Sequence, residues 1–226
     1  MKKYSTLYID VDGTLLDFIA AESHAAEQLF KDYGLPHDGK AVKLYSGIND
    51  RYWKMFEEGR ITKPELVVLR FEELLKVFGE KRDAKQMNRD YFELLSHCHF
   101  LIDGATETLT YLKKSGYLMY AATNGVVKTQ YKRIRESGIE PFFDGIFVSE
   151  VIGFQKPSPE YFDYIIEHTP EKDRSKILVI GDSMTSDIKG GTDSGLDTCW
   201  YDAFGEKKTS EPTYTVKNIR ELTCIL

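Results

Sequence analysis

Two aspartates one residue apart, Asp10 and Asp12, directly follow the apolar segment Thr6–Ile9. Two carboxylates at this spacing repel each other unless a cation lies between them or one of them takes up a proton. The next residues, Gly13 and Thr14, can form a turn that directs backbone amides toward an anion. An Asp-Gly pair can also do no more than end a strand in a turn. The pattern therefore indicates a metal or anion site, with a plain turn as the alternative.

A second pair of acids, Asp182 and Asp187, follows another apolar segment, 177–180. If both segments are parallel strands of one sheet, Asp182 lies at the same edge of that sheet as the first pair. Helix capping is the alternative role for Asp182, and a neighbouring serine or threonine would serve it equally well. Capping does not explain why both strands end in a carboxylate, so the spacing favours one shared acidic site.

Residues that could bind an anion lie in two further segments. Thr123 and Asn124 precede a helical pattern over 126–137, so a hydroxyl and backbone amides are expected at a helix N-terminus. Lys156 lies in a proline-rich loop ahead of a helical pattern over 158–168. A single lysine in a loop is usually a solvated charge. Together with the acids, Lys156 would supply the cation that an acidic, phosphate-handling site requires.

The segments that carry these residues alternate between strand and helix. Five short apolar runs, each typical of a strand buried on both faces, lie at 6–9, 117–122, 145–148, 177–180 and 197–201. Helical patterns separate the later runs. This alternation predicts an α/β fold, with a parallel sheet that has helices on both faces and a ligand site at the carboxyl ends of its strands.

The first interval of this alternation is much too long for a simple crossover. A strand-helix-strand unit takes about 30 residues, whereas residues 10–116 separate the first two runs. This interval contains helical patterns over 18–33, 41–58, 62–78 and 83–96, and a fifth over 105–115. We therefore predict an α/β core formed by residues 1–16 and 99–226, and an inserted all-α cap domain formed by residues 17–98.

The composition narrows the class of partner. The 226-residue chain has 36 acidic against 30 basic residues, a net charge of −6, and nucleic-acid binding usually needs a basic surface. The N-terminus does not have the pattern of a signal peptide, no apolar stretch approaches the roughly 18 residues of a membrane span, and three scattered cysteines form no disulfide framework. We expect a cytoplasmic protein that binds a small molecule and neither nucleic acid nor membrane. Whether it is a monomer or a homodimer stays open.

Four groups of residues, taken in order, resemble the motifs of the haloacid dehalogenase-like (HAD) hydrolase superfamily. They are Asp10-Val11-Asp12-Gly13-Thr14, Thr123-Asn124, Lys156-Pro157, and Gly181-Asp182 with Asp187. The resemblance extends along the whole chain, since the motifs run from residue 10 to residue 187 with the helical insert in the usual place. It implies a Rossmann-like parallel sheet with an inserted helical cap of the C1 type.

The resemblance also implies catalytic and metal-binding roles. Asp10 would be the nucleophile that forms an aspartyl-phosphate, and Asp12 would act as general acid and then as general base. Asp10, Asp182 and the backbone carbonyl of Asp12 would hold Mg²⁺, for which Mn²⁺ could substitute. Asp187 would orient Lys156 or a water on the metal.

Phosphate binding is assigned by the same resemblance to Thr123, the amide of Asn124 and Lys156, which would contact the phosphoryl oxygens as their charge redistributes. The presence of Asp12 favours a phosphate-monoester hydrolase over a dehalogenase, which needs neither this acid nor the metal. A phosphomutase with the same motifs stays open. A phosphoacceptor or ligand sensor of the receiver type also stays open, although such domains have no large helical insert and need no general acid.

The cap is similar to that of the pyrimidine 5′-nucleotidase branch of this superfamily, over segments 46–56, 59–62 and 70–72. That branch cleaves nucleoside monophosphates such as UMP, dUMP and dTMP. By this resemblance Trp53 or Phe56 could stack on a base, and Asn49 or Arg70 could reach its polar edge or the sugar. The alternative is that these residues, at helical spacing, simply pack inside the cap. A phosphatase for sugar phosphates or phosphoglycolate is the alternative substrate class.

Overall fold

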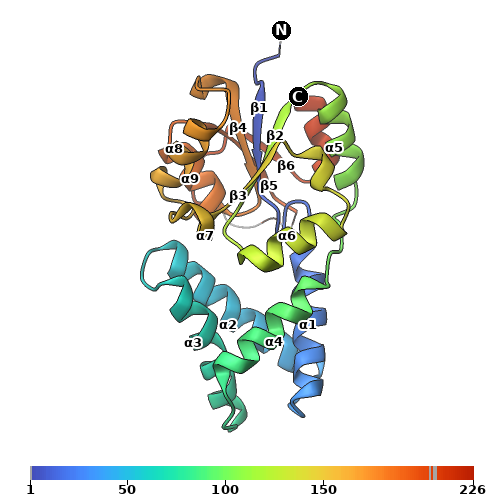
Figure 1. The fold of residues 1–226 in the computed structure, drawn as a ribbon, viewed down its shortest axis with the longest axis vertical. Coiled ribbons are helices and arrows are strands. Elements are labelled where there is room, and N and C mark those ends of the chain that lie inside the picture. Colours follow the sequence, from blue (N-terminus) through green and yellow to red (C-terminus); the bar gives the residue numbers. More distant parts are fainter. Residues whose placement is uncertain (1, 204, 206–207) are drawn as a thin grey trace. The chain divides into compact units, whose positions relative to one another are not determined.

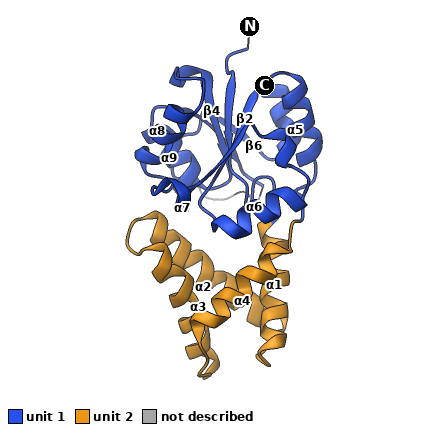
Figure 2. Cartoon of the chain, viewed as in Figure 1, with its two compact units in different colours: residues 1–17, 100–226 blue, residues 18–99 orange. Residues whose placement is uncertain are grey.

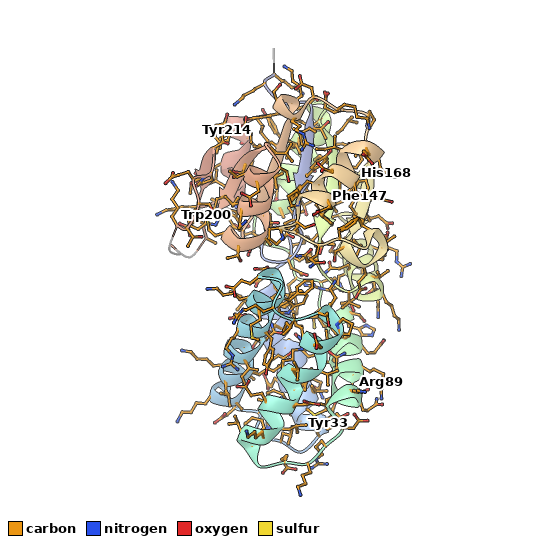
Figure 3. The ribbon with its side chains drawn as sticks, turned by 90° about the vertical axis from the view of Figure 1, so that its left-hand side faces the viewer. Tyr33, Arg89, Phe147, His168, Trp200 and Tyr214 are labelled. Carbon is orange, nitrogen blue, oxygen red and sulfur yellow. The ribbon has the colours of Figure 1, made fainter. Side chains whose placement is uncertain are left out.

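The computed structural model describes residues 2–203, 205 and 208–226, and the chain divides into two compact units (Figures 1 and 2). One unit comprises residues 1–17 and 100–226, and the other comprises residues 18–99. Each boundary lies one residue beyond the one predicted from the sequence. Side chains fill both units: Phe147, His168 and Trp200 belong to the first, and Tyr33 and Arg89 to the second (Figure 3).

The first unit is built on one parallel sheet in the order β3-β2-β1-β4-β5-β6. Its strands are β1 (Thr6–Ile9), β2 (Leu118–Thr123), β3 (Gly145–Val148), β4 (Ile177–Gly181), β5 (Asp197–Tyr201) and β6 (Tyr214–Val216). The predicted α/β class and five of these strands are confirmed. The sixth strand was not predicted, because three residues are too few to show a period in the sequence.

The register of the sheet brings the ends of β1, β2 and β4 to within two residues of the same level. Ile9, the last residue of β1, pairs with Ala121 of β2 on one side and with Ile180 of β4 on the other. The residues that follow β1, β2 and β4 therefore meet at one edge of the sheet. This is the edge at which the acids and the anion-binding residues were predicted to converge.

Helices cover both faces of this sheet (Figure 1). On one face, Leu7 and Ile9 of β1 share a core with Leu109 of α5. On the other, Tyr8 of β1 packs in a core with Tyr161 of α8. The helices of this unit are α5 (Ala105–Lys114), α6 (Val127–Glu136), α7 (Ser149–Ile152), α8 (Pro159–His168), α9 (Lys189–Asp193) and α10 (Leu222–Ile225). A one-turn π-helix, Met184–Ile188, precedes α9.

The second unit consists of four helices around a core of their own: α1 (Phe18–Asp32), α2 (Gly39–Glu57), α3 (Lys63–Phe78) and α4 (Ala84–Ser96). The predicted N-terminal box of α3 is present, since the Glu65 carboxylate accepts hydrogen bonds from the Thr62 amide and hydroxyl, both at 2.8 Å. The helix ends at Gly79, whose φ of +70° suits glycine. Among the described residues, no helix combines the length and the apolar character needed to cross a bilayer.

Candidate active site

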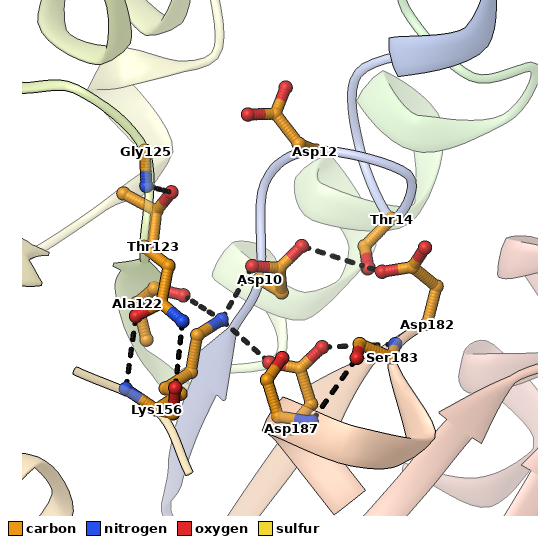
Figure 4. Close-up of polar contacts among 12 residues, drawn as sticks. Asp10, Asp12, Thr14, Ala122, Thr123, Gly125, Lys156, Asp182, Ser183 and Asp187 are labelled. Carbon is orange, nitrogen blue, oxygen red and sulfur yellow. Dashed lines mark hydrogen bonds and ion pairs between the residues drawn. The ribbon is translucent and has the colours of Figure 1, made fainter. Parts of the chain in front are cut away.

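A buried lysine connects three of the strand ends (Figure 4). Lys156 Nζ donates hydrogen bonds to Asp10 Oδ1 and to Asp187 Oδ1, each at 2.6 Å, and to the carbonyl of Ala122 at 2.7 Å. Burial opposes the charged form of Lys156, but the attraction of Asp10 and Asp187 outweighs it, and the pKa of the ammonium lies above its usual value. Lys156 is therefore a fixed cation next to the predicted nucleophile.

The loop that carries Lys156 is held by the side chain of Asn124. Asn124 Nδ2 donates to the carbonyl of Lys156 at 2.8 Å, and the amide of Lys156 donates to Asn124 Oδ1 at 2.9 Å. From the sequence, a role is predicted only for the backbone amide of Asn124, in phosphate binding. Since Asn124 follows the end of β2, this pair of hydrogen bonds sets the position of Lys156 relative to the sheet.

Asp187 approaches the site because a glycine leaves room for it. A Cβ atom at Gly181 would lie 2.3 Å from the carboxyl carbon of Asp187, so only glycine fits there. Asp187 belongs to the π-helical turn after β4, and its Oδ2 accepts a hydrogen bond from the amide of Ser183 at 3.1 Å. Its other oxygen binds Lys156. The structure thus brings Asp187 into contact with Lys156, which is one of the two arrangements predicted for it.

The third carboxylate, Asp182, meets the turn that follows β1. A Cβ atom at Gly13, where φ is +85°, would lie 2.2 Å from Asp182 Oδ2, so this position also requires glycine. The Thr14 hydroxyl lies 3.3 Å from both Asp10 Oδ2 and Asp182 Oδ1. The indole of Trp200 donates to the carbonyl of Asp182 at 2.8 Å. The tight Asp-Gly-Thr turn is therefore part of the acidic site and not only a strand ending.

The three carboxylates form a group that suits a divalent cation. One oxygen from each of Asp10, Asp182 and Asp187 lies within 4.8 Å of the others. Burial, reinforced by Asp187 and Asp12 and opposed by Lys156, raises the pKa of Asp10 to about 7. Burial and the neighbouring Asp10 also raise the pKa of Asp182. Three clustered carboxylates against one ammonium leave a negative excess, and oxygen donors of this kind are those that Mg²⁺ prefers.

The other predicted phosphate-binding residue, Thr123, is buried at the end of β2, with Asn124 next to it. Its hydroxyl accepts a hydrogen bond from the amide of Gly125 at 3.0 Å, which shapes the turn into α6 (Figure 4). The assignment of phosphate contacts to Thr123 and Asn124 stays a prediction, as does the role of the Asp12 carbonyl in metal binding.

Asp12 lies apart from the three clustered carboxylates. Its carboxyl group points away from Asp182 and Asp187 (Figure 4) and is bound by Arg133 and Gln130 of α6. The sequence alone did not predict these two partners of Asp12. Their spacing of three residues places them on one face of the helix that follows the Thr123–Asn124 segment. This spacing is the feature of the sequence that could have indicated a shared partner.

Two of the predicted substrate-contacting residues, Asn49 and Arg70, lie inside the helical unit. Arg70 donates to Asn49 Oδ1 at 2.6 Å and to Asn88 Oδ1 at 2.9 Å, and Asn49 donates to Glu22 Oε1 at 2.7 Å. The Arg70 guanidinium also lies 4.8 Å from the ring centre of Tyr91. Both side chains are buried, and all of these contacts are with other residues of the helical unit. Their contact with substrate stays a prediction.

The two aromatic residues predicted to contact the substrate, Trp53 and Phe56, differ in exposure. Phe56 is buried, whereas Trp53 is half-buried. Their ring centres lie 5.7 Å apart in an edge-to-face arrangement. Of the four candidate residues in the cap, Trp53 is thus the one with the most exposed side chain. Stacking of either ring on a base stays a prediction.

The buried Glu22 of this unit predicts a specific dependence of stability on pH. Burial, aided by Asp50 and opposed by Ser46, Arg70 and Asn49, raises the pKa of Glu22 from 4.5 to about 7. The folded state therefore holds a proton that the unfolded state releases, and stability is lost as the pH rises from 4.5 to 7. The free energy of unfolding of the wild type should therefore fall by about 3 kcal/mol more than that of Glu22→Gln between pH 4.5 and pH 7. Urea unfolding across this pH range measures both values.

The matched control is Glu72→Gln, which neutralises an exposed acid in the same unit. Its unfolding free energy should run parallel to that of the wild type over the whole range. If Glu22→Gln also runs parallel to the wild type, Glu22 does not hold a proton in the folded state.

Comparison with known proteins assigns the chain to a family. A sequence model described as haloacid dehalogenase-like hydrolase matches residues 4–195. YfnB of Bacillus subtilis (strain 168), which is named as a HAD-hydrolase, is 46% identical over 100% of this chain and 97% of its own length. A crystal structure of YfnB bound to magnesium has a TM-score of 0.94 to this chain, at 45% identity and with 99% of each chain covered.

Two further relatives carry a more specific name. PynA of Streptococcus pneumoniae, named as a pyrimidine 5′-nucleotidase, is 37% identical over 97% of this chain and 93% of its own length. YjjG of Escherichia coli (strain K12), with the same enzyme name, is 28% identical over 99% of this chain and 98% of its own length. With four motifs at one sheet edge and relatives matched along its whole length, the chain belongs to the haloacid dehalogenase-like hydrolase family.

Proposed function

We propose that this chain is a Mg²⁺-dependent phosphate-monoester hydrolase that forms an aspartyl-phosphate on Asp10 and acts on pyrimidine nucleoside 5′-monophosphates. The observation that carries the proposal is the contact of Lys156 with Asp10 at the carboxyl end of the central strand, with a second acid, Asp12, two residues further on. A nucleophile, a cation and an acid-base residue are the groups that transfer of a phosphoryl group to a carboxylate requires.

The first step would form the covalent intermediate. Asp10 attacks phosphorus, and a new O–P bond forms while the bond between phosphorus and the leaving oxygen breaks, with its electron pair staying on that oxygen. Asp12 gives this oxygen a proton, and the alcohol departs. Lys156 and Thr14 contact different oxygens of Asp10, which fixes the plane of the attacking carboxyl group.

The second step would restore Asp10. A water molecule attacks phosphorus, Asp12 takes one of its protons, and the bond between phosphorus and Asp10 breaks. One water is consumed, and one alcohol and one phosphate are released. Lys156, with Thr123 and the amide of Asn124, would bind the phosphoryl oxygens in both steps.

The metal would be held by Asp10, Asp182 and the backbone carbonyl of Asp12, with Asp187 alongside. When bound, it supplies positive charge that offsets the repulsion between the carboxylates and an anionic phosphate. The fit of the carboxylate group to an oxygen-liganded cation supports this assignment, as does the magnesium in the YfnB structure.

The preference for pyrimidine nucleotides is supported by relatives. PynA aligns with nearly all of this chain, including the four helices of residues 18–99 in which specificity is expected. Trp53, half-buried on α2, is the residue of this unit that we propose stacks on the base.

A panel of monoesters tests the proposal directly. We expect phosphate release from UMP, dUMP and dTMP with a kcat/KM at least about tenfold above that for AMP, sugar phosphates and phosphoglycolate. EDTA should abolish the release, and Mg²⁺ or Mn²⁺ should restore it. A preference for sugar phosphates or phosphoglycolate would contradict the nucleotidase assignment and leave the phosphatase assignment intact.

Two other results would overturn the phosphatase itself. An isomerised phosphosugar without release of phosphate would make the chain a mutase. A phosphorylated Asp10 that persists without turnover would make it a phosphoacceptor or sensor.

A further inference from the structure

Both oxygens of the Asp12 carboxylate are held by one face of α6. Arg133 Nη1 donates to Asp12 Oδ1, and Gln130 Nε2 donates to Asp12 Oδ2. The side chain of Arg133 is 0% exposed and Gln130 is 2% exposed, whereas the Asp12 side chain keeps 23% of its surface. Two donors on two different oxygens fix the rotation of the carboxyl group as well as its place.

The same helix begins at the segment proposed to bind phosphate. Thr123 ends β2, and α6 starts at Val127, so Gln130 lies within the first turn of the helix and Arg133 one turn later. A Cβ atom at Gly125 would lie 2.0 Å from the side-chain nitrogen Nε2 of Gln130, so the glycine leaves the space that this side chain occupies. One rigid element thus carries both the phosphate-binding turn and the anchors of Asp12.

A purely structural reading exists for this pair. A buried guanidinium needs an anion to compensate its charge, and Asp12 supplies one whether or not it takes part in catalysis. On the same reading, the buried amide group of Gln130 uses Asp12 as the acceptor that a buried donor needs. Orientation of the carboxyl group accounts in addition for the division of the two donors between its two oxygens, and only this second role predicts a dependence on the leaving group.

We propose that Gln130 and Arg133 are positioning residues for Asp12, which set the distance and angle between its carboxyl group and a phosphoryl group at Thr123. This inference rests on the proposed function, because it concerns the acid-base residue of that reaction. A misplaced acid loses its catalytic effect even where the nucleophile and the fold are intact.

The chemical consequence depends on the leaving group. The oxygen that departs from UMP is an alkoxide unless it receives a proton, so its release depends on Asp12. The oxygen that departs from p-nitrophenyl phosphate is a stabilised phenolate, which leaves without a proton. Loss of positioning should therefore slow the first step for UMP and leave that step largely unchanged for p-nitrophenyl phosphate.

The experiment compares first-turnover rates of Gln130→Met, Arg133→Met and Arg133→Lys, with Arg135→Met as the matched control. Arg135 lies on the same helix but is exposed. We expect Gln130→Met and Arg133→Met to lower the UMP rate about 100-fold, and the burst of nitrophenolate by no more than about threefold. Arg133→Lys should recover part of the UMP rate, and Arg135→Met should match the wild type on both substrates.

Equal losses on the two substrates would show that the pair only supports the fold and would overturn the inference, as would unchanged rates on both. If Arg133→Met fails to fold, Gln130→Met decides the question, since it removes no charge. Failure of the phosphatase assignment gives a different result, because the wild type itself would then release no phosphate from any monoester of the panel. Failure of the nucleotidase assignment alone would show as a wild type that prefers another monoester of the panel to UMP.

Discussion

Asp10→Asn is expected to abolish phosphate release from UMP, with kcat lowered by more than about 10⁴-fold. An amide oxygen is a poor nucleophile toward phosphorus, and no acyl-phosphate can form on it. The fold should persist, because the substitution removes one of three mutually repelling carboxylates and Lys156 keeps its hydrogen bonds to Asp187 and to the carbonyl of Ala122. Steady-state phosphate release and circular dichroism measure the two effects separately.

The matched control for this variant is Asp193→Asn. Asp193 is exposed on α9, where it pairs with Lys189. The Asp193→Asn variant should keep wild-type activity. In a second experiment, wild-type enzyme quenched with acid during turnover of a substrate radiolabelled in its phosphate should carry the label, whereas Asp10→Asn should carry none. Activity of Asp10→Asn near the wild-type level would refute the aspartyl-phosphate mechanism.

Lys156→Met is expected to have the largest effect on stability. Removing one partner of a buried ion pair costs about 3–5 kcal/mol, since the remaining charge stays desolvated without compensation. Here two carboxylates, those of Asp10 and Asp187, would lose the same ammonium. We also expect kcat to fall about 10³-fold, because the cation that we propose binds the phosphoryl oxygens is lost. Urea unfolding in EDTA and phosphate release give the two values.

The control, Lys189→Met, removes an exposed lysine from an ion pair with Asp193 and should cost less than about 1 kcal/mol. Added Mg²⁺ should return part of the stability of Lys156→Met, since a bound divalent cation offsets the same carboxylates. If the two lysine variants are equally stable in EDTA, the Lys156 pairs contribute nothing to the fold and the electrostatic account of the site is wrong.

The order and spacing of the strand-end residues could be predicted because the strands of a parallel sheet have a recognisable sequence pattern. Each central strand is buried on both faces and is therefore a continuous apolar run, as 6–9 and 177–180 are. A polar residue directly after such a run must lie at the carboxyl edge of the sheet. The positions of Asp10 and Asp182 at this edge therefore follow from the sequence alone.

The helical insert was recognisable for a related reason. Four amphipathic segments with end signals, including the Thr62 and Glu65 box and Gly79, are local features that depend on few distant contacts. The period of apolar residues, however, does not distinguish a polar residue that faces solvent from one buried in a polar network. The sequence therefore leaves Asn49 and Arg70 as candidates for substrate contact, whereas in the structure they bond to each other and to Glu22 and Asn88 within the same helical unit.

What only the tertiary structure decided are the contacts between residues far apart in the chain. The Asn124 side chain and the Lys156 backbone, which are hydrogen-bonded to each other, lie 32 residues apart in the sequence. Arg133 and Asp12, which are also in contact, lie 121 residues apart. Such pairs leave no local pattern, because they depend on which strands are neighbours and on how each helix is rotated. The sequence by itself determined which residues reach the edge of the sheet, and the packing of the helices determined which of them hold one another in place.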